Sequence, residues 1–105
     1  MEQPNLNYIE QLSAGDEIFK QKLISIIKKE FPNELHTYIS NLNAKKYRLA
    51  ADNVHKLKHK ISILGLEKSY KIAEDYENDL RVCRLDLNKD FDQILQTISN
   101  YLDTL

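Results

Sequence analysis

The sequence predicts an all-α protein: an antiparallel four-helix bundle with a short additional N-terminal helix, built by residues 1–105 as a single domain. Two observations carry this prediction. The 105 residues include only two Gly and two Pro, and good helix formers fill many of the other positions. Apolar residues also recur at three- and four-residue spacing, which is the period of a helix with one buried face.

The first predicted helix is short and covers residues 5–12, with Leu6, Ile9 and Leu12 at three-residue steps. Gly15 suits the left-handed conformation that often ends a helix, and Asp16 is a good N-cap for the helix that follows. These residues therefore predict a break between two helices.

The second predicted helix is long and runs from Asp16 to about Asn43. Pro32 lacks an N–H and clashes with the preceding turn, so we expect a kink there. The apolar stripe nevertheless resumes in phase after Pro32, which favours one helix over two. Its expected members are Phe19, Leu23, Ile26, Ile27, Phe31, Leu35, Tyr38, Ile39 and Leu42.

The third predicted helix runs from about Lys46 to Leu64 and has a regular inner stripe. Gly65 is expected to end it, with Leu66 supplying the hydrophobic contact that often accompanies such an end. The stripe is typical of the inward face of a helix bundle and consists of Tyr47, Ala50, Val54, Leu57, Ile61 and Leu64.

Two further helices complete the predicted bundle. The fourth covers about Glu67 to Arg81, and its inner stripe is Ser69, Ala73, Tyr76, Leu80 and Cys83. The last is capped by Asn88 or Asp90, and its apolar residues are Phe91, Ile94, Leu95, Ile98, Leu102 and Leu105. Short connections make consecutive helices antiparallel neighbours.

Composition excludes several classes of protein. The net charge of −1 does not favour binding to nucleic acid or to an anionic membrane. The single cysteine, Cys83, excludes an internal disulfide framework and a cysteine-rich zinc site. No signal-peptide pattern and no membrane-spanning apolar run is visible. The expectation is a soluble cytoplasmic domain.

The residues that carry chemistry lie on the third helix. On a helical wheel His55 points roughly 130° away from the core direction, and His59 lies nearly opposite the core. Both imidazoles should therefore reach water. Lys58 follows His55 by one turn, within reach of its side chain. Ala51, Ser62 and Ile63 flank this face and predict a partly apolar surface suited to docking.

This arrangement suits the transfer of a phosphoryl group. A neutral imidazole is a nucleophile near pH 7. A phosphoryl group on its nitrogen carries about two negative charges, part of which the Lys58 ammonium could neutralise. The sequence has no Gly-rich phosphate loop. It therefore predicts a site that receives and passes on a phosphoryl group without generating one.

The pattern resembles the histidine-containing phosphotransfer (HPt) domains of multistep two-component phosphorelays. In that family a helix carries a His, an apolar residue two positions on, a Lys three on and a Gly ten on. Here these are His55, Leu57, Lys58 and Gly65. The flanking matches are Gly15-Asp16-Glu17, Phe31-Pro32, Ala50-Ala51 and Leu66-Glu67. The resemblance covers most of the chain.

The resemblance implies that His55 is the phosphoacceptor, that Lys58 stabilises the phosphohistidine, and that Gly65 is structural. It implies exchange with the phospho-aspartate of a response-regulator receiver domain or a hybrid sensor kinase. That partner would supply the acidic residues and the divalent metal, so no cofactor is expected in this chain. The docking surface would include Ala51, His59, Ser62 and Ile63, on a protein that is monomeric and has no kinase activity of its own.

One position departs from the family. Many relatives have Gly directly after the Lys, followed by small residues, whereas this chain has His59 and Lys60. A bulky His59 changes the docking geometry, or it donates a hydrogen bond to the phosphoryl group or the partner. The alternative function is therefore an interaction module that binds a receiver domain without phosphotransfer.

Metal binding is a further alternative for the two histidines. His55 and His59 have the i, i+4 spacing of metal ligands. The neighbouring Lys56, Lys58 and Lys60 oppose a dication, so no metal site is expected.

Overall fold

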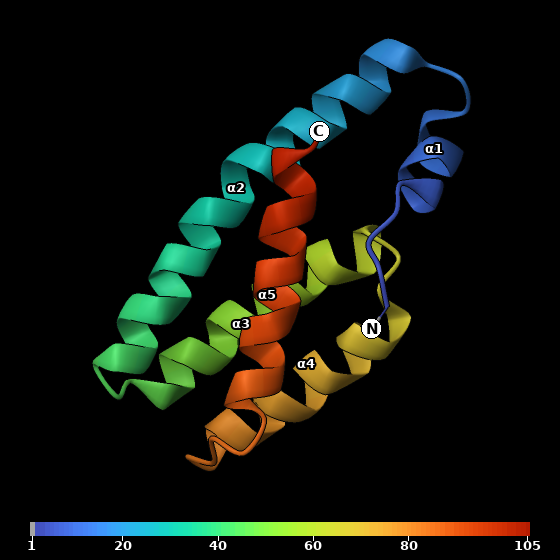
Figure 1. Ribbon diagram of the computed structural model, residues 1–105. Coiled ribbons are helices and arrows are strands. Elements are labelled where there is room, and N and C mark those ends of the chain that lie inside the picture. The colour runs from blue at the N-terminus through green and yellow to red at the C-terminus, as the bar shows by residue number, and fades with distance from the viewer. Residues whose placement is uncertain (1) are drawn as a thin grey trace.

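The computed structural model describes residues 2–105, which form an all-helical protein (Figure 1). No strand occurs in this part of the chain. The helices are α1 (Asn7–Ser13), α2 (Glu17–Asn43), α3 (Tyr47–Ile63), α4 (Glu67–Arg81) and α5 (Asn88–Asp103). The ranges agree closely with the predicted ones, which confirms the all-α class.

The long helix α2 begins as predicted. The Asp16 side chain accepts a hydrogen bond from the backbone N–H of Phe19 at 3.0 Å, which satisfies one of the free donors of the first turn. The helix then continues without interruption through Pro32. The prediction of one helix across Pro32 is thus confirmed.

Helix α3 is the centre of the packing, because it contacts both α2 and α4. Its predicted stripe is buried except for Tyr47, which is half-buried. In Figure 1, α3 turns back along α2, and α5 lies across the pair. The short α1 contacts the first part of α2.

Three aromatic rings join α2, α4 and α5 in the core. Tyr38 and Tyr76 share a hydrogen bond between their hydroxyl groups at 2.7 Å, and both rings contact Phe91. Asn88 donates to the Tyr76 hydroxyl at 3.1 Å. Both phenols are thus paired although they are buried, as buried polar groups must be.

Several predicted details are wrong. Asn88 does not cap α5, because its side chain binds Tyr76 and the cap position falls on Leu87, where no side chain makes a capping bond. Asp90 lies within the first turn instead. Cys83 is exposed and has a φ of 62°, since α4 ends at Arg81 and the chain turns away from the core. The last predicted core residue, Leu105, is exposed.

The stripe predicted for α2 is only partly correct. Ile27, Phe31 and Tyr38 are buried, but Ile24, which the prediction omitted, is buried as well. The predicted members Phe19, Ile26 and Ile39 are each more than 40% exposed. Helix α2 therefore buries a narrower face than its apolar content indicates.

The N-terminal segment forms hydrogen bonds with the turn between α3 and α4 and with the first turn of α4. The backbone N–H of Asn5 donates to the carbonyl of Leu64 at 2.9 Å. The Glu2 carboxylate accepts hydrogen bonds from the backbone N–H groups of Lys68 and Ser69, both at 3.0 Å. This acidic side chain thus satisfies donors in the first turn of α4, where the helix dipole favours negative charge.

Gly65 is predicted to be sensitive to substitution. Its φ of 77° suits only glycine at low cost, and an added Cβ would lie 2.6 Å from the Asn5 side chain. We expect Gly65→Ala to lower the free energy of unfolding by about 1–3 kcal/mol, measured by urea denaturation. Gly15→Ala is the control, because Gly15 has a φ of 87° but open space around it. Equal losses in the two variants would show that the contact with Asn5 contributes nothing.

Candidate functional site

Helix α3 presents His55 and Lys58 to different environments. The His55 side chain is 54% exposed, as the helical wheel predicts, whereas the Lys58 side chain is only 9% exposed. Lys58 leans toward α4, and its Nζ lies 5.4 Å from the centre of the Tyr70 ring. The imidazole is therefore open to a partner, whereas the ammonium is nearly buried against α4.

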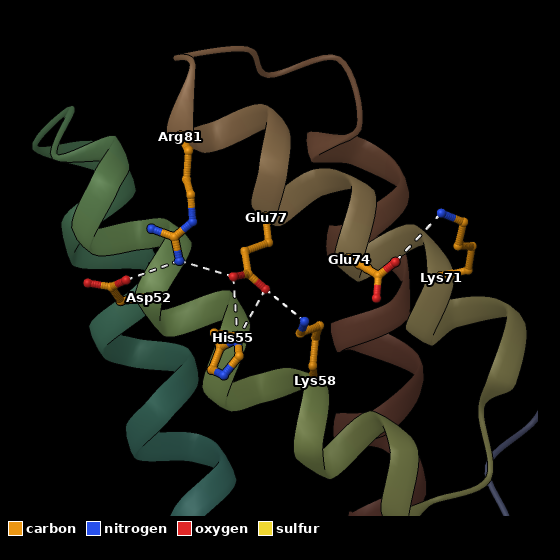
Figure 2. A network of polar contacts seen from close by, with 7 residues as sticks. All are labelled: Asp52, His55, Lys58, Lys71, Glu74, Glu77 and Arg81. Carbon is orange, nitrogen blue, oxygen red and sulfur yellow. Dashed lines mark hydrogen bonds and ion pairs between the residues drawn. The ribbon is translucent and has the colours of Figure 1, made fainter.

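Glu77, from α4, connects the two residues (Figure 2). Its carboxylate lies 2.9 Å from Lys58 Nζ, and both of its oxygens lie 3.3 Å from His55 Nδ1. The Glu77 side chain is 10% exposed. One buried carboxylate thus contacts both residues that the sequence pattern singles out.

Arg81 extends this network toward solvent. One of its terminal nitrogens lies 3.0 Å from Glu77 Oε2 and 3.2 Å from Asp52 Oδ1 (Figure 2). Asp52 lies one turn before His55 on α3, and Arg81 lies one turn after Glu77 on α4. The charges alternate along the network, so that Glu77 faces two permanent cations.

The cations determine the ionisation of Glu77. Burial alone would raise the pKa of this carboxyl, but hydrogen bonds from Lys58, Arg81 and His55 outweigh burial and hold the pKa below its ordinary value. Glu77 is therefore a carboxylate at neutral pH.

The position of this carboxylate defines which nitrogen of His55 is available. An ionised carboxylate only accepts hydrogen bonds, so Nδ1 of the neutral imidazole must carry the proton and donate it to Glu77. The lone pair then resides on Nε2. The exposed ring is thus held as a nucleophile with its reactive nitrogen on the side away from Glu77.

The residues predicted to form a docking surface are not all exposed. His59 and Ser62 lie at the surface, and Ile63 is half-buried against the core. Ala51 is fully buried, so the expectation that it flanks the exposed face is wrong. A shallow depression also lies beside His55, toward the start of α3. The residues that line it include Leu49, Asn53 and Lys56.

Sequence reasoning missed Glu77 and Arg81. Glu77 stands among other acidic residues of α4, which on sequence grounds favours a solvated position. Two signals could have identified it: Glu77 follows the buried Ala73 by four residues, and it precedes Arg81 by four, the spacing of a helical ion pair. His55 and Glu77 are also equally distant along the chain from Leu66, in the turn about which α3 and α4 reverse direction.

A pH titration of stability tests the ionised state of Glu77. Its pKa is lower in the folded protein than the value of about 4.3 expected when unfolded. The stabilisation that ionised Glu77 gives the folded protein is therefore fully present well above pH 4.3. It is lost as the pH falls through the pKa of Glu77 in the folded state. We expect urea unfolding free energies between pH 7 and pH 3 to fall more steeply for the wild type than for Glu77→Gln. Parallel curves would contradict this assignment.

Within residues 2–105, no group of three or more His, Cys, Asp or Glu side chains is arranged to hold a metal ion. None of the helices there is both long and apolar enough to traverse a bilayer.

Comparisons with known proteins found no matching family model, no matching curated protein and no matching solved structure.

Proposed function

We propose that this protein is a phosphorelay intermediate that accepts a phosphoryl group on His55 and passes it to a response regulator. The observation that carries the proposal is the exposed imidazole whose Nδ1 is bound to the buried Glu77 carboxylate. The resemblance of the His55, Leu57, Lys58 and Gly65 pattern to HPt domains points the same way. The donor would be the phospho-aspartate of a receiver domain, alone or within a hybrid sensor kinase.

The transfer step follows from the geometry of the imidazole. The Nε2 lone pair attacks the phosphorus of the aspartyl phosphate, so that a P–N bond forms while the P–O bond to the aspartate breaks and its carboxylate leaves. The His55 ring then carries a positive charge while Nδ1 keeps its proton. The Glu77 carboxylate, on the Nδ1 side, stabilises that charge. Transfer to the next aspartate reverses these steps.

Lys58 has two roles in this proposal. Its contact with Glu77 at 2.9 Å balances the buried carboxylate in the resting state. A lysine ammonium has three donors, and the described hydrogen-bonding contact uses one of them on Glu77. A remaining donor would bind a phosphoryl oxygen on His55. Lys58 follows His55 by one helical turn, so a movement of its side chain toward His55 would bring this donor within reach of the phosphoryl group.

The partner supplies what this chain lacks. The receiver domain would bring the acidic residues and the divalent metal that activate the phosphoryl group. In this proposal the chain has no independent kinase activity, and it acts as a monomer in the cytoplasm. Helices α2–α5 would form an antiparallel four-helix bundle, with α1 as the additional N-terminal helix. His59, Ser62 and Ile63 would belong to the docking surface.

Phosphotransfer profiling tests the proposal. The purified protein is incubated with a panel of phosphorylated receiver domains, and the modified residue is located by mass spectrometry. We expect label on His55 that is labile in acid and stable in base, as a phosphoramidate is. No label from any receiver, or label on another residue, would contradict the proposal.

The alternative is an interaction module that binds a receiver domain without phosphotransfer. This alternative is favoured by His59, whose ring contacts that of His55 at a centroid distance of 5.4 Å. A side chain of this size beside His55 restricts the space in which a partner can reach the imidazole. The two functions are separated by the same panel combined with a binding measurement. A module would form a complex with a receiver domain while His55 stayed unmodified.

A further inference from the structure

His55 and His59 lie next to each other on the exposed face of α3. Their ring centroids are 5.4 Å apart and the ring planes are inclined at 73°. Both residues are exposed. Two imidazoles bound to one tetrahedral Zn²⁺, with Zn–N bonds of about 2.0–2.1 Å, have centroids about 5 Å apart. The observed separation is thus compatible with both rings binding one ion.

Three lysines argue against a metal site on sequence grounds, but two of them form ion pairs with carboxylates. Lys58 contacts Glu77, and Lys60 contacts Glu30 at 2.8 Å and Glu34 at 3.2 Å. Lys56 is exposed to water, where its charge is screened. The cationic repulsion expected from three neighbouring lysines is therefore largely cancelled.

Glu77 prepares His55 to act as a metal ligand. A metal-binding histidine commonly donates its other N–H to a carboxylate, which fixes the tautomer and makes the ligand nitrogen more basic. The His55 Nδ1 contact with Glu77 at 3.3 Å has this form and leaves Nε2 available. The buried carboxylate is thus an observation independent of the histidine spacing.

We propose that His55 and His59 form a two-imidazole site for a borderline transition-metal dication such as Zn²⁺, with water completing the coordination. Imidazole nitrogens suit Zn²⁺, Ni²⁺ and Cu²⁺, whereas Mg²⁺ and Ca²⁺ require oxygen ligands. The site does not depend on phosphotransfer. If His55 is the phosphoacceptor, the ion and the phosphoryl group compete for Nε2, so each excludes the other.

Calorimetric titration with ZnCl₂ tests the site, in a buffer that does not bind metals. All proteins carry Cys83→Ser, because an exposed thiol such as that of Cys83 can itself bind zinc. We expect one Zn²⁺ per chain, and affinity lower by about tenfold or more in His59→Gln, because the chelate is lost. His36→Gln is the matched control and should bind as tightly as the parent, since His36 is exposed on α2. MgCl₂ should give no binding.

A second measurement tests the role of Glu77. Imidazole ¹⁵N resonances should show Zn²⁺ on Nε2 of His55 with the proton retained on Nδ1. Glu77→Gln should weaken binding by about tenfold or more. Unchanged affinity in His59→Gln, or weakening in His36→Gln, would overturn the site. These results do not involve a receiver domain, so they remain interpretable even if the phosphotransfer panel gives no label.

Discussion

Replacing His55 with glutamine is expected to abolish phosphoryl labelling by every receiver domain that labels the wild type. Glutamine has no nucleophilic ring nitrogen, so no P–N bond can form at this position. The side chain is 54% exposed, so its loss should leave the helical fold intact. The measurement is phosphotransfer from a labelled receiver, with circular dichroism as the check on folding.

His59→Gln and His36→Gln are the controls for this prediction. Both replace an exposed histidine with glutamine and should still be labelled. Label that persists in His55→Gln and disappears in His59→Gln would identify His59 as the acceptor and refute the assignment. Loss of label in His36→Gln would indicate that the assay does not report on α3.

Glu77→Ala is expected to cause the largest loss of stability among substitutions in the network. The variant leaves the Lys58 ammonium without its carboxylate at a position where the side chain is only 9% exposed. Removing one partner of a buried ion pair costs about 3–5 kcal/mol, because the remaining charge is desolvated and uncompensated. Urea denaturation at pH 7 measures the loss.

Glu74→Ala is the matched control for Glu77→Ala. Glu74 lies on the same helix and contacts Lys71 (Figure 2), but the two side chains are 44% and 68% exposed, far more than those of Glu77 and Lys58. Its removal should change the free energy of unfolding by less than about 0.5 kcal/mol. A loss in Glu77→Ala as small as that in Glu74→Ala would show that the carboxylate does not compensate a buried charge.

Local sequence predicted the helices because most of their signals are local. The apolar stripes of α3 and α4 each lie on one face of their helix. The turn between these helices contains Gly65, which has a positive φ. The stripe of α2 was less accurate because this helix is much longer than its neighbours and is covered unevenly along its length. Which apolar residues of α2 are buried depends on where α1, α3 and α5 lie, and periodicity within α2 does not contain that information.

The candidate site, too, could be predicted only in part from the local sequence. His55 and its exposure follow from the helical wheel of α3, which is local. The burial of Lys58 and the role of Glu77 depend on the register between α3 and α4, which places the carboxylate against both residues. From sequence alone Glu77 does not stand out, because an acidic residue among other acidic residues is usually exposed. A buried charge becomes recognisable only when its counter-ions on the neighbouring helix are known.

The contacts of residues 2–5 have a practical consequence for handling the protein. Glu2 and Asn5 hold the α3–α4 turn from outside, and that turn sets how His55 and Glu77 face each other. An affinity tag fused directly before this segment, or a protease that trims it, would thus act on the contact between His55 and Glu77 from a distance. Purification handles are better placed away from residues 2–5, so that measurements report on the protein with this segment undisturbed.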